Sequence, residues 1–400
     1  MAIYIYKVKD ETGRALYGVM DVPTKKDVKR RLVNTDLFYI SAEPFHLNRL
    51  FRKGTDLQAL TMFTHRLTSL VEAGIPILPA MNILWRQTED KTMQLVICYL
   101  KLELEDGNRI SDAMGNFPRI FPPVYRALIR VAEIGGALVQ VLRKLTEYLE
   151  HQAQIVTRTK KALFYPLIVV AFSILVTIGM FTFVVPTFEK ILLKLNIDLP
   201  LITQMIIKLS HLLRSWIFWA SLAAGVLILI VFYRRFRYEP HFALIKDKFI
   251  YNFPHLGRIM FLISLSRFVR SLSVLLGAGI PIMESLDVAK STSANQLIIA
   301  NLDKIKRKIE SGGSLYHSFK EVNVFPVMMI EMLGVGESSG MLVKVLEKLT
   351  KHFDEEIDYE INKFLTILEP FLIIVIGAVV LLTLLAVYMP IVTIWQGLTR

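Results

Sequence analysis

The residues LVQVLRKLT at Leu138–Thr146 and LVKVLEKLT at Leu342–Thr350 agree at seven of nine positions. The agreement extends upstream, where AGIPI at Ala73–Ile77 recurs at Ala278–Ile282. A chance match does not keep its register over more than a hundred residues. The sequence therefore carries one long unit twice, and this duplication organises the whole chain.

The register also continues downstream of these blocks. Two proline steps recur, Tyr165-Pro166 as Glu369-Pro370 and Val185-Pro186 as Met389-Pro390. The offset between the copies is 205 residues at Ala73 and 204 from Phe121 onward, so one residue has been lost between these positions.

The composition is that of a membrane protein, because 53% of the 400 residues are hydrophobic and the mean hydropathy is +0.46. Three uncharged runs, 162–188, 215–233 and 370–399, hold 27, 19 and 30 residues. Each exceeds the roughly 18 residues that a membrane-spanning helix needs. The next run, 271–283, holds only 13 residues and is expected to be soluble core. We therefore expect three spans.

Basic residues cluster beside the first two runs, as Arg158, Lys160 and Lys161 and as Arg234, Arg235 and Arg237. Lysine and arginine near span ends stay on the cytoplasmic side. The unpaired middle run then returns the chain across the membrane, and both copies face the cytoplasm as parallel repeats. This topology explains the net charge of +12 better than nucleic-acid binding does.

The expected fold is a mainly α, integral membrane protein with two homologous cytoplasmic helical-bundle domains, three transmembrane helices and a small N-terminal α+β segment. Alternating residues and a turn-like Asp10–Gly13 predict a hairpin and a short helix in that segment. Apolar residues spaced three and four apart predict a helix from Leu57 that Gly74 and Pro76 end. Further helices are expected near 78–88, 91–105, 110 and 122–134, and a last helix runs into the span.

The predicted boundaries are 1–45 for the N-terminal segment, 46–56 for a basic linker, 57–161 for the first bundle, 162–185 for span one, 186–214 for a periplasmic connection, 215–233 for span two, 234–366 for the second bundle, 367–389 for span three and 390–400 for a periplasmic tail.

No pattern predicts catalysis, a cofactor or a metal. The glycine-rich Gly334–Gly340 follows no expected strand, and no Gly-Lys-Ser or Gly-Lys-Thr occurs, so it is interpreted as a helix end and turn. The eight histidines are scattered, and Cys98 has no partner cysteine, so neither zinc nor a disulfide is expected. The uncharged runs also lack the ionisable residues of a proton or ion relay.

Two acidic features remain as candidate partner-binding residues. Glu133 and Glu337 fall at equivalent positions in the last turn of an expected helix, where the helix dipole disfavours an acid. Bonds to the amides of the turn would explain them, and a partner's basic side chain or a bound cation is the alternative. Asp354, Glu355 and Glu356 form either a solvated face or a docking surface for a basic partner.

Six further residues are candidate structural turns or hinges: Gly74, Gly136, Gly279, Gly340, Pro166 and Pro370. The two prolines stand where apolar runs begin, and a proline inside a helix should bend it. The sequence is compatible with either a fixed bend or a moving hinge at each proline.

Several motifs resemble those of one family, the inner-membrane platform proteins of type II secretion and type IV pilus machines, known as secretion F and pilus C. They include Phe63-x-x-x-Leu67 with Ala73–Pro76, Glu133-x-x-Gly136, Ala162–Pro166, Leu368–Pro370 and Tyr388–Ile391. The resemblance spans nearly the whole chain.

The resemblance implies a non-enzymatic protein in the bacterial inner membrane that couples a cytoplasmic hexameric assembly ATPase to pilin or pseudopilin transmembrane helices. It also implies contacts with other inner-membrane assembly proteins and membrane lipids, a homo-oligomer, and no nucleic acid. The alternative function is a small polytopic transporter or channel component. The sequence does not separate secretion from pilus assembly.

Overall fold

The computed structural model describes residues 3–33, 35, 37–44, 54–194, 201–236, 256–293 and 295–398. Most of the predicted linker 46–56 and the beginning of the predicted second bundle lie outside these residues. The chain divides into two compact units. One comprises residues 1–157 and 261–356, and the other comprises residues 158–260 and 357–400.

The N-terminal segment is a three-stranded antiparallel sheet with one helix. Its elements are β1 (Ile3–Lys9), β2 (Ala15–Asp21), α1 (Lys25–Leu32) and β3 (Phe38–Pro44), and the strand order is β2-β1-β3. The predicted hairpin and helix are confirmed, and β3 is an additional strand. Tyr6 on β1 pairs with Gly18 on β2, and a Cβ at Gly18 would lie 2.3 Å from Cζ of Tyr6. This close approach requires glycine.

The edge strand β2 docks on the first helical bundle through its backbone. The amide of Tyr17 donates to Oε1 of Gln94 at 2.8 Å, and its carbonyl accepts from Nε1 of Trp85 at 2.7 Å. The amide of Val19 donates to Sγ of Cys98 at 3.2 Å. Side chains of the bundle thus satisfy the open edge of the sheet.

The first bundle consists of α3 (Leu57–Glu72), α4 (Ile77–Gln87), α5 (Lys91–Glu105), α6 (Ile110–Gly115) and α7 (Pro123–Gly135), followed by the beginning of α8 (Leu138–Gly179). The predicted helices are therefore present. The apolar stripes of these helices form the core of the bundle. Leu67, Met81 and Tyr125 are among its fully buried side chains.

The second bundle repeats these elements as α13 (Leu256–Gly277), α14 (Ile282–Lys290), α15 (Gln296–Glu310), α16 (Leu315–Lys320) and α17 (Val327–Ser339), followed by α18 (Leu342–Leu398). The ends of α6 and α16 are 205 residues apart, and the starts of α7 and α17 are 204 apart. The lost residue therefore lies in the connection after the short helix, where deletion disturbs no helix.

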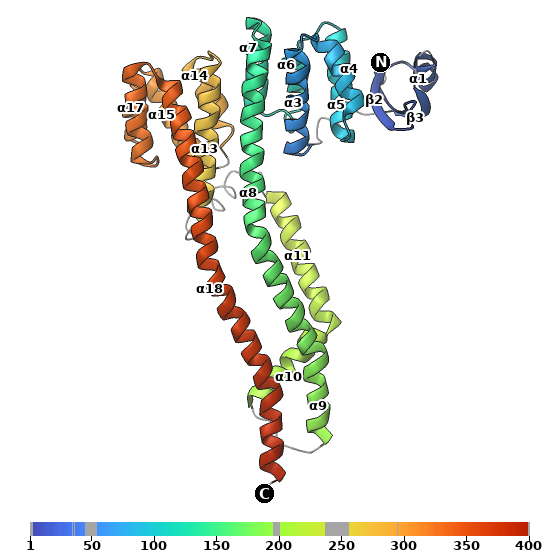
Figure 1. The fold of residues 1–400 in the computed structure, drawn as a ribbon, viewed down its shortest axis with the longest axis vertical. Helices are drawn as coiled ribbons and strands as arrows, with labels where there is room; N and C mark the ends of the chain where they lie inside the picture. The colour runs from blue at the N-terminus through green and yellow to red at the C-terminus, as the bar shows by residue number, and fades with distance from the viewer. Residues whose placement is uncertain are drawn as a thin grey trace. The chain divides into compact units, whose positions relative to one another are not determined.

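Figure 1 shows α8 and α18 each as one long helix. Pro166 lies inside α8, and Pro370 lies inside α18. After α8 the chain continues as the π-helix η1 (Met180–Val184), α9 (Val185–Lys194), α10 (Leu201–Arg214) and α11 (Trp216–Phe236). In η1, just before Pro186, the backbone hydrogen bonds join residues five apart instead of four. The hydroxyl of Ser210 on α10 donates to the carbonyl of Phe181 in η1 at 2.5 Å.

Among the described residues, three helical stretches are long and apolar enough to cross a membrane: Leu138–Thr187, Leu256–Gly277 and Leu342–Leu381. The first contains predicted span one, and the third contains the first part of predicted span three, which begins at residue 367. In the most apolar part of α13, 67% is buried within the protein. The predicted middle span instead lies on the shorter described stretch Trp216–Phe232, whose residues are nearly all exposed. Burial thus distinguishes the core-facing α13 from the outward-facing α11.

Candidate functional site

Glu133 caps a neighbouring helix. It lies in the last turn of α7, and its carboxylate accepts hydrogen bonds from the amides of Ile110 at 2.7 Å and Ser111 at 3.2 Å, and from the hydroxyl of Ser111. These amides form the first turn of α6, whose positive dipole end attracts a carboxylate. The bonds are to backbone amides, as the sequence suggested, but those amides belong to a different helix and not to the turn after α7.

Glu337 repeats this arrangement in the second bundle. Its carboxylate accepts from the amides of Leu315 at 2.8 Å and Tyr316 at 3.1 Å, at the beginning of α16. The second copy has an additional cap, because the hydroxyl of Ser314 accepts from the amide of His317 at 3.2 Å. For α6, no side-chain cap comes from its own N-cap residue, Arg109. The first copy therefore depends more on its glutamate.

The four candidate glycines occupy left-handed turns. Their φ angles are 80° at Gly74, 66° at Gly136, 83° at Gly279 and 68° at Gly340. Gly136 and Gly340 directly follow the helices that carry the capping glutamates, so the chain turns there into α8 and α18.

The acidic residues of α18 within the first unit have different environments. Asp354 forms an ion pair with Arg270 on α13 and accepts a hydrogen bond from the hydroxyl of Ser266 at 3.1 Å. Glu355 is exposed, and Glu356 lies 3.8 Å from Nε2 of His352. Asp354 therefore holds α18 against α13, and Glu355 is the one of the three that is exposed.

Two more acids of the same run, Asp358 and Glu360, follow on α18 in the second unit. Oδ2 of Asp358 lies 2.8 Å from Nη1 of Arg158 on α8. The side chain of Glu360 is only 2% exposed, and its Oε1 lies 3.1 Å from Nε of Arg258. Its other oxygen is buried and has no hydrogen-bond partner among the described residues. The acidic run thus divides into structural ion pairs and a smaller exposed portion.

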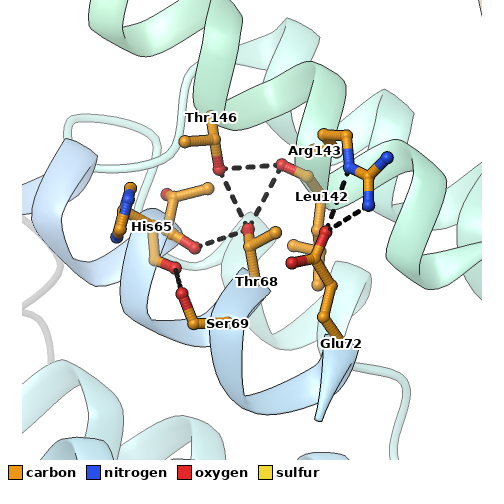
Figure 2. A network of polar contacts seen from close by, with 8 residues as sticks. His65, Thr68, Ser69, Glu72, Leu142, Arg143 and Thr146 are labelled. Carbon is orange, nitrogen blue, oxygen red and sulfur yellow. Dashed lines mark hydrogen bonds and ion pairs between the residues drawn. The ribbon is translucent and has the colours of Figure 1, made fainter. Parts of the chain in front are cut away.

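A polar network holds α3 to α8 in the first bundle (Figure 2). The hydroxyl of Thr68 lies 2.9 Å from that of Thr146 and 3.3 Å from the carbonyl of Leu142. At the edge of this network, Arg143 donates to Oε1 of Glu72 from Nε at 3.0 Å and from Nη2 at 2.8 Å. No motif of the sequence indicated this seam, although its members share one face of each helix.

The two repeats meet where α8 packs against α13. Nζ of Lys144 donates to the carbonyl of Gly277, and the hydroxyls of Tyr148 and Ser271 are 3.2 Å apart. Burial raises the pKa of the Tyr148 phenol, which therefore stays protonated and can donate to Ser271. These contacts tie the first copy to the second.

A cavity of about 260 Å³ adjoins this contact and is lined by α8, α13 and α18. Its charged residues have both signs, and one opposing pair, Arg270 and Asp354, is already bonded. Ser273 and Thr350, the second-copy counterparts of Thr68 and Thr146, also line it. We interpret this cavity as part of the seam between repeats.

No group of three or more His, Cys, Asp or Glu residues that could hold a metal ion occurs in the described part of the chain. Cys98 is buried against β2, where burial raises the pKa of its thiol. The polar and charged side chains described above therefore hold neighbouring helices together. The arrangement supports a structural role for these residues in helix packing.

Comparison with known proteins agrees with this architecture. A family profile described as "Type II secretion system (T2SS), protein F" matches residues 63–186 and again residues 268–390. The chain is 30% identical over 405 residues to the type IV pilus assembly protein PilC of Thermus thermophilus, covering 98% of this chain and 97% of the relative. It is 29% identical over 409 residues to the type II secretion system protein F of Pseudomonas aeruginosa, covering 99% of each.

A PilC of Myxococcus xanthus is 28% identical over 401 residues, covering 98% of this chain and 94% of the relative. The two profile matches fall on the two structural repeats, and each begins inside the first long helix of its bundle and ends near the second proline step. The chain therefore belongs to the type II secretion system protein F family, the inner-membrane assembly proteins of type II secretion and type IV pilus machines.

Proposed function

We propose that this chain is a non-enzymatic platform that couples a cytoplasmic assembly ATPase to the assembly of pilin or pseudopilin subunits. The observation that carries the proposal is the continuity of α8 and α18. Each begins in a helical bundle and continues as one helix into an apolar stretch. Because no loop separates the bundle from the apolar stretch, such a helix can transmit a displacement of the bundle along its axis.

The proposed coupling uses both bundles on the cytoplasmic side. The basic residues beside the first two apolar runs support this orientation. An ATPase acting on the bundles would then move α8 and α18 together, because Arg270 with Asp354 and Lys144 with Gly277 connect the helices of this unit.

Orientation can be tested with introduced cysteines in intact cells. Lys304→Cys on α15 and Lys208→Cys on α10 replace exposed side chains, whereas the native Cys98 is buried. We expect a membrane-impermeant thiol reagent to label Lys208→Cys and to leave Lys304→Cys unlabelled until the cells are opened. The reverse pattern would refute the orientation.

Coupling can be tested by interrupting α8. Four glycines inserted between Thr157 and Arg158 should break the helix between its bundle and its apolar part, because glycine is a poor helix former. We expect filament assembly or secretion to stop, while the ATPase still copurifies with the tagged full-length chain. The same insertion after Glu89, in the connection between α4 and α5, is the matched control and should retain assembly. Normal assembly with the helix interrupted would contradict mechanical coupling.

A further inference from the structure

Pro166 and Pro370 line the same cavity. It has a volume of about 300 Å³ and lies between α8 and α18, with Ala162 and Tyr165 on one side and Thr366 and Glu369 on the other. These residues stand where the uncharged runs 162–188 and 370–399 begin. The cavity is therefore at the boundary between the water-exposed and apolar parts of both helices.

Several hydrogen-bond acceptors line this cavity beside its apolar side chains. A proline has no amide hydrogen, so the carbonyl four residues earlier loses its usual helical donor. The two carbonyls affected are those of Ala162 and Thr366, and both residues line the cavity. The carboxylate of Glu369 adds a negative charge, and the described lining residues include no Lys, Arg or His. A cationic group with N–H donors would complement this set.

An apolar groove continues from the cavity along the same helices. It has a volume of about 350 Å³ and shares Leu372 with the cavity. Val170, Ile174 and Val375 line it, together with Trp219 of α11. An apolar groove that adjoins an acceptor-lined cavity fits an amphipathic molecule with a cationic head.

We propose that this cavity and groove bind a phospholipid whose headgroup carries a primary ammonium, such as phosphatidylethanolamine. The ammonium occupies the cavity beside Glu369, and an acyl chain lies along the groove. The cavity is far larger than a bare metal ion needs, since one water occupies about 30 Å³ in the liquid.

The chemistry predicts headgroup selectivity. A choline headgroup is cationic but has no N–H to donate to the carbonyls of Ala162 and Thr366, and a glycerol headgroup has no positive charge. Native mass spectrometry of the full-length chain in detergent, with phosphatidylethanolamine, phosphatidylcholine and phosphatidylglycerol of identical acyl chains, measures this selectivity directly. We expect the ethanolamine lipid to be retained several-fold more than the other two.

Three variants locate the site. Glu369→Gln removes the charge and should weaken retention of the ethanolamine lipid by about tenfold, the size of one charge-assisted bond. Glu355→Gln makes the same change at an exposed position of α18 and should behave as the unmodified chain. Pro370→Ala restores the amide that bonds the carbonyl of Thr366, so it should lower the preference for ethanolamine over choline.

The groove has its own variant, Ile174→Trp, which fills it and should reduce retention of all three lipids. The proposal is overturned if the unmodified chain shows no headgroup preference, if Glu369→Gln keeps that preference, or if Ile174→Trp retains lipid normally. A spectrum without lipid, together with a copurifying membrane protein that Ile174→Trp releases, would assign the groove to a protein helix and also overturn it.

Discussion

Removing the carboxylate of Glu133 should loosen α6 without unfolding the rest of the first bundle. In Glu133→Ala the amides of Ile110 and Ser111 lose the acceptor that lies 2.7 and 3.2 Å away, and the hydroxyl of Ser111 loses its partner as well. The six residues of α6 cannot compensate within their own helix, because their N-cap residue makes no side-chain bond.

The free-energy cost of this substitution follows from the number of hydrogen bonds that it removes. A hydrogen bond to a charged group contributes about 1.5–3 kcal/mol, and these contributions are not fully additive, so we expect Glu133→Ala to cost about 3 kcal/mol locally. Glu337→Ala should cost about half as much, because only two amides are released and Ser314 still caps α16. We therefore expect Glu133→Ala to cost more than Glu337→Ala, although the two glutamates occupy equivalent positions in the repeats.

Amide hydrogen exchange of the full-length chain in detergent, followed by mass spectrometry, reports this local opening. The peptide over 110–115 should lose protection by roughly a hundredfold in Glu133→Ala, since about 1.4 kcal/mol corresponds to tenfold. Glu355→Ala, at an exposed position, serves as the control. Unchanged protection in Glu133→Ala, accompanied by loss of a binding partner, would refute the capping role and favour a partner's basic side chain.

Three other substitutions test the seams and turns, each measured as a shift in thermal unfolding of the full-length chain. Thr68→Val keeps the shape but removes the hydroxyl that bonds Thr146, and should destabilise the first bundle by about 1 kcal/mol. Arg270→Ala leaves the partly buried carboxylate of Asp354 without its cation and should cost about 2–3 kcal/mol, part of which Asp354→Asn in the same chain should restore. Gly136→Ala places a side chain at a φ of 66° and should cost about 1 kcal/mol, whereas Gly135→Ala, inside the helix with no atom within 4 Å of the new Cβ, should be neutral or slightly stabilising.

The sequence predicted the helices well because their signal is local. The apolar residues of 57–72 repeat at the helical period, and Leu60, Phe63 and Leu67 among them are buried on α3. Strand β3 was missed for a physical reason. It joins the sheet edge through its backbone, while Phe38 and Ile40 are 66% and 44% exposed and only Ala42 is buried. Such a strand lacks a clear alternation of buried and exposed residues.

The contacts of the candidate site could not be predicted, because they join residues far apart in the chain. Glu133 could be identified as unusual from its position at the negative end of a helix, but its partner α6 lies 22 residues away in sequence. The ion pair between Asp354 and Arg270 spans 84 residues. Periodicity indicates which residues face a core, whereas the choice of partner across a helix pair depends on how the helices pack.

The differences between the two copies explain how they dock. In the first copy Glu72 pairs with Arg143 and closes α3 against α8. The equivalent residues in the second copy are Gly277 and Glu347, so this pair is absent there. The carbonyl of Gly277 instead accepts from Lys144 of the first copy, and a Cβ at that position would lie 3.3 Å from its Nζ. A glutamate at 277 would crowd this lysine. The second copy thus has a glycine where the first has one member of an ion pair, and the backbone of that glycine forms part of the contact between the repeats.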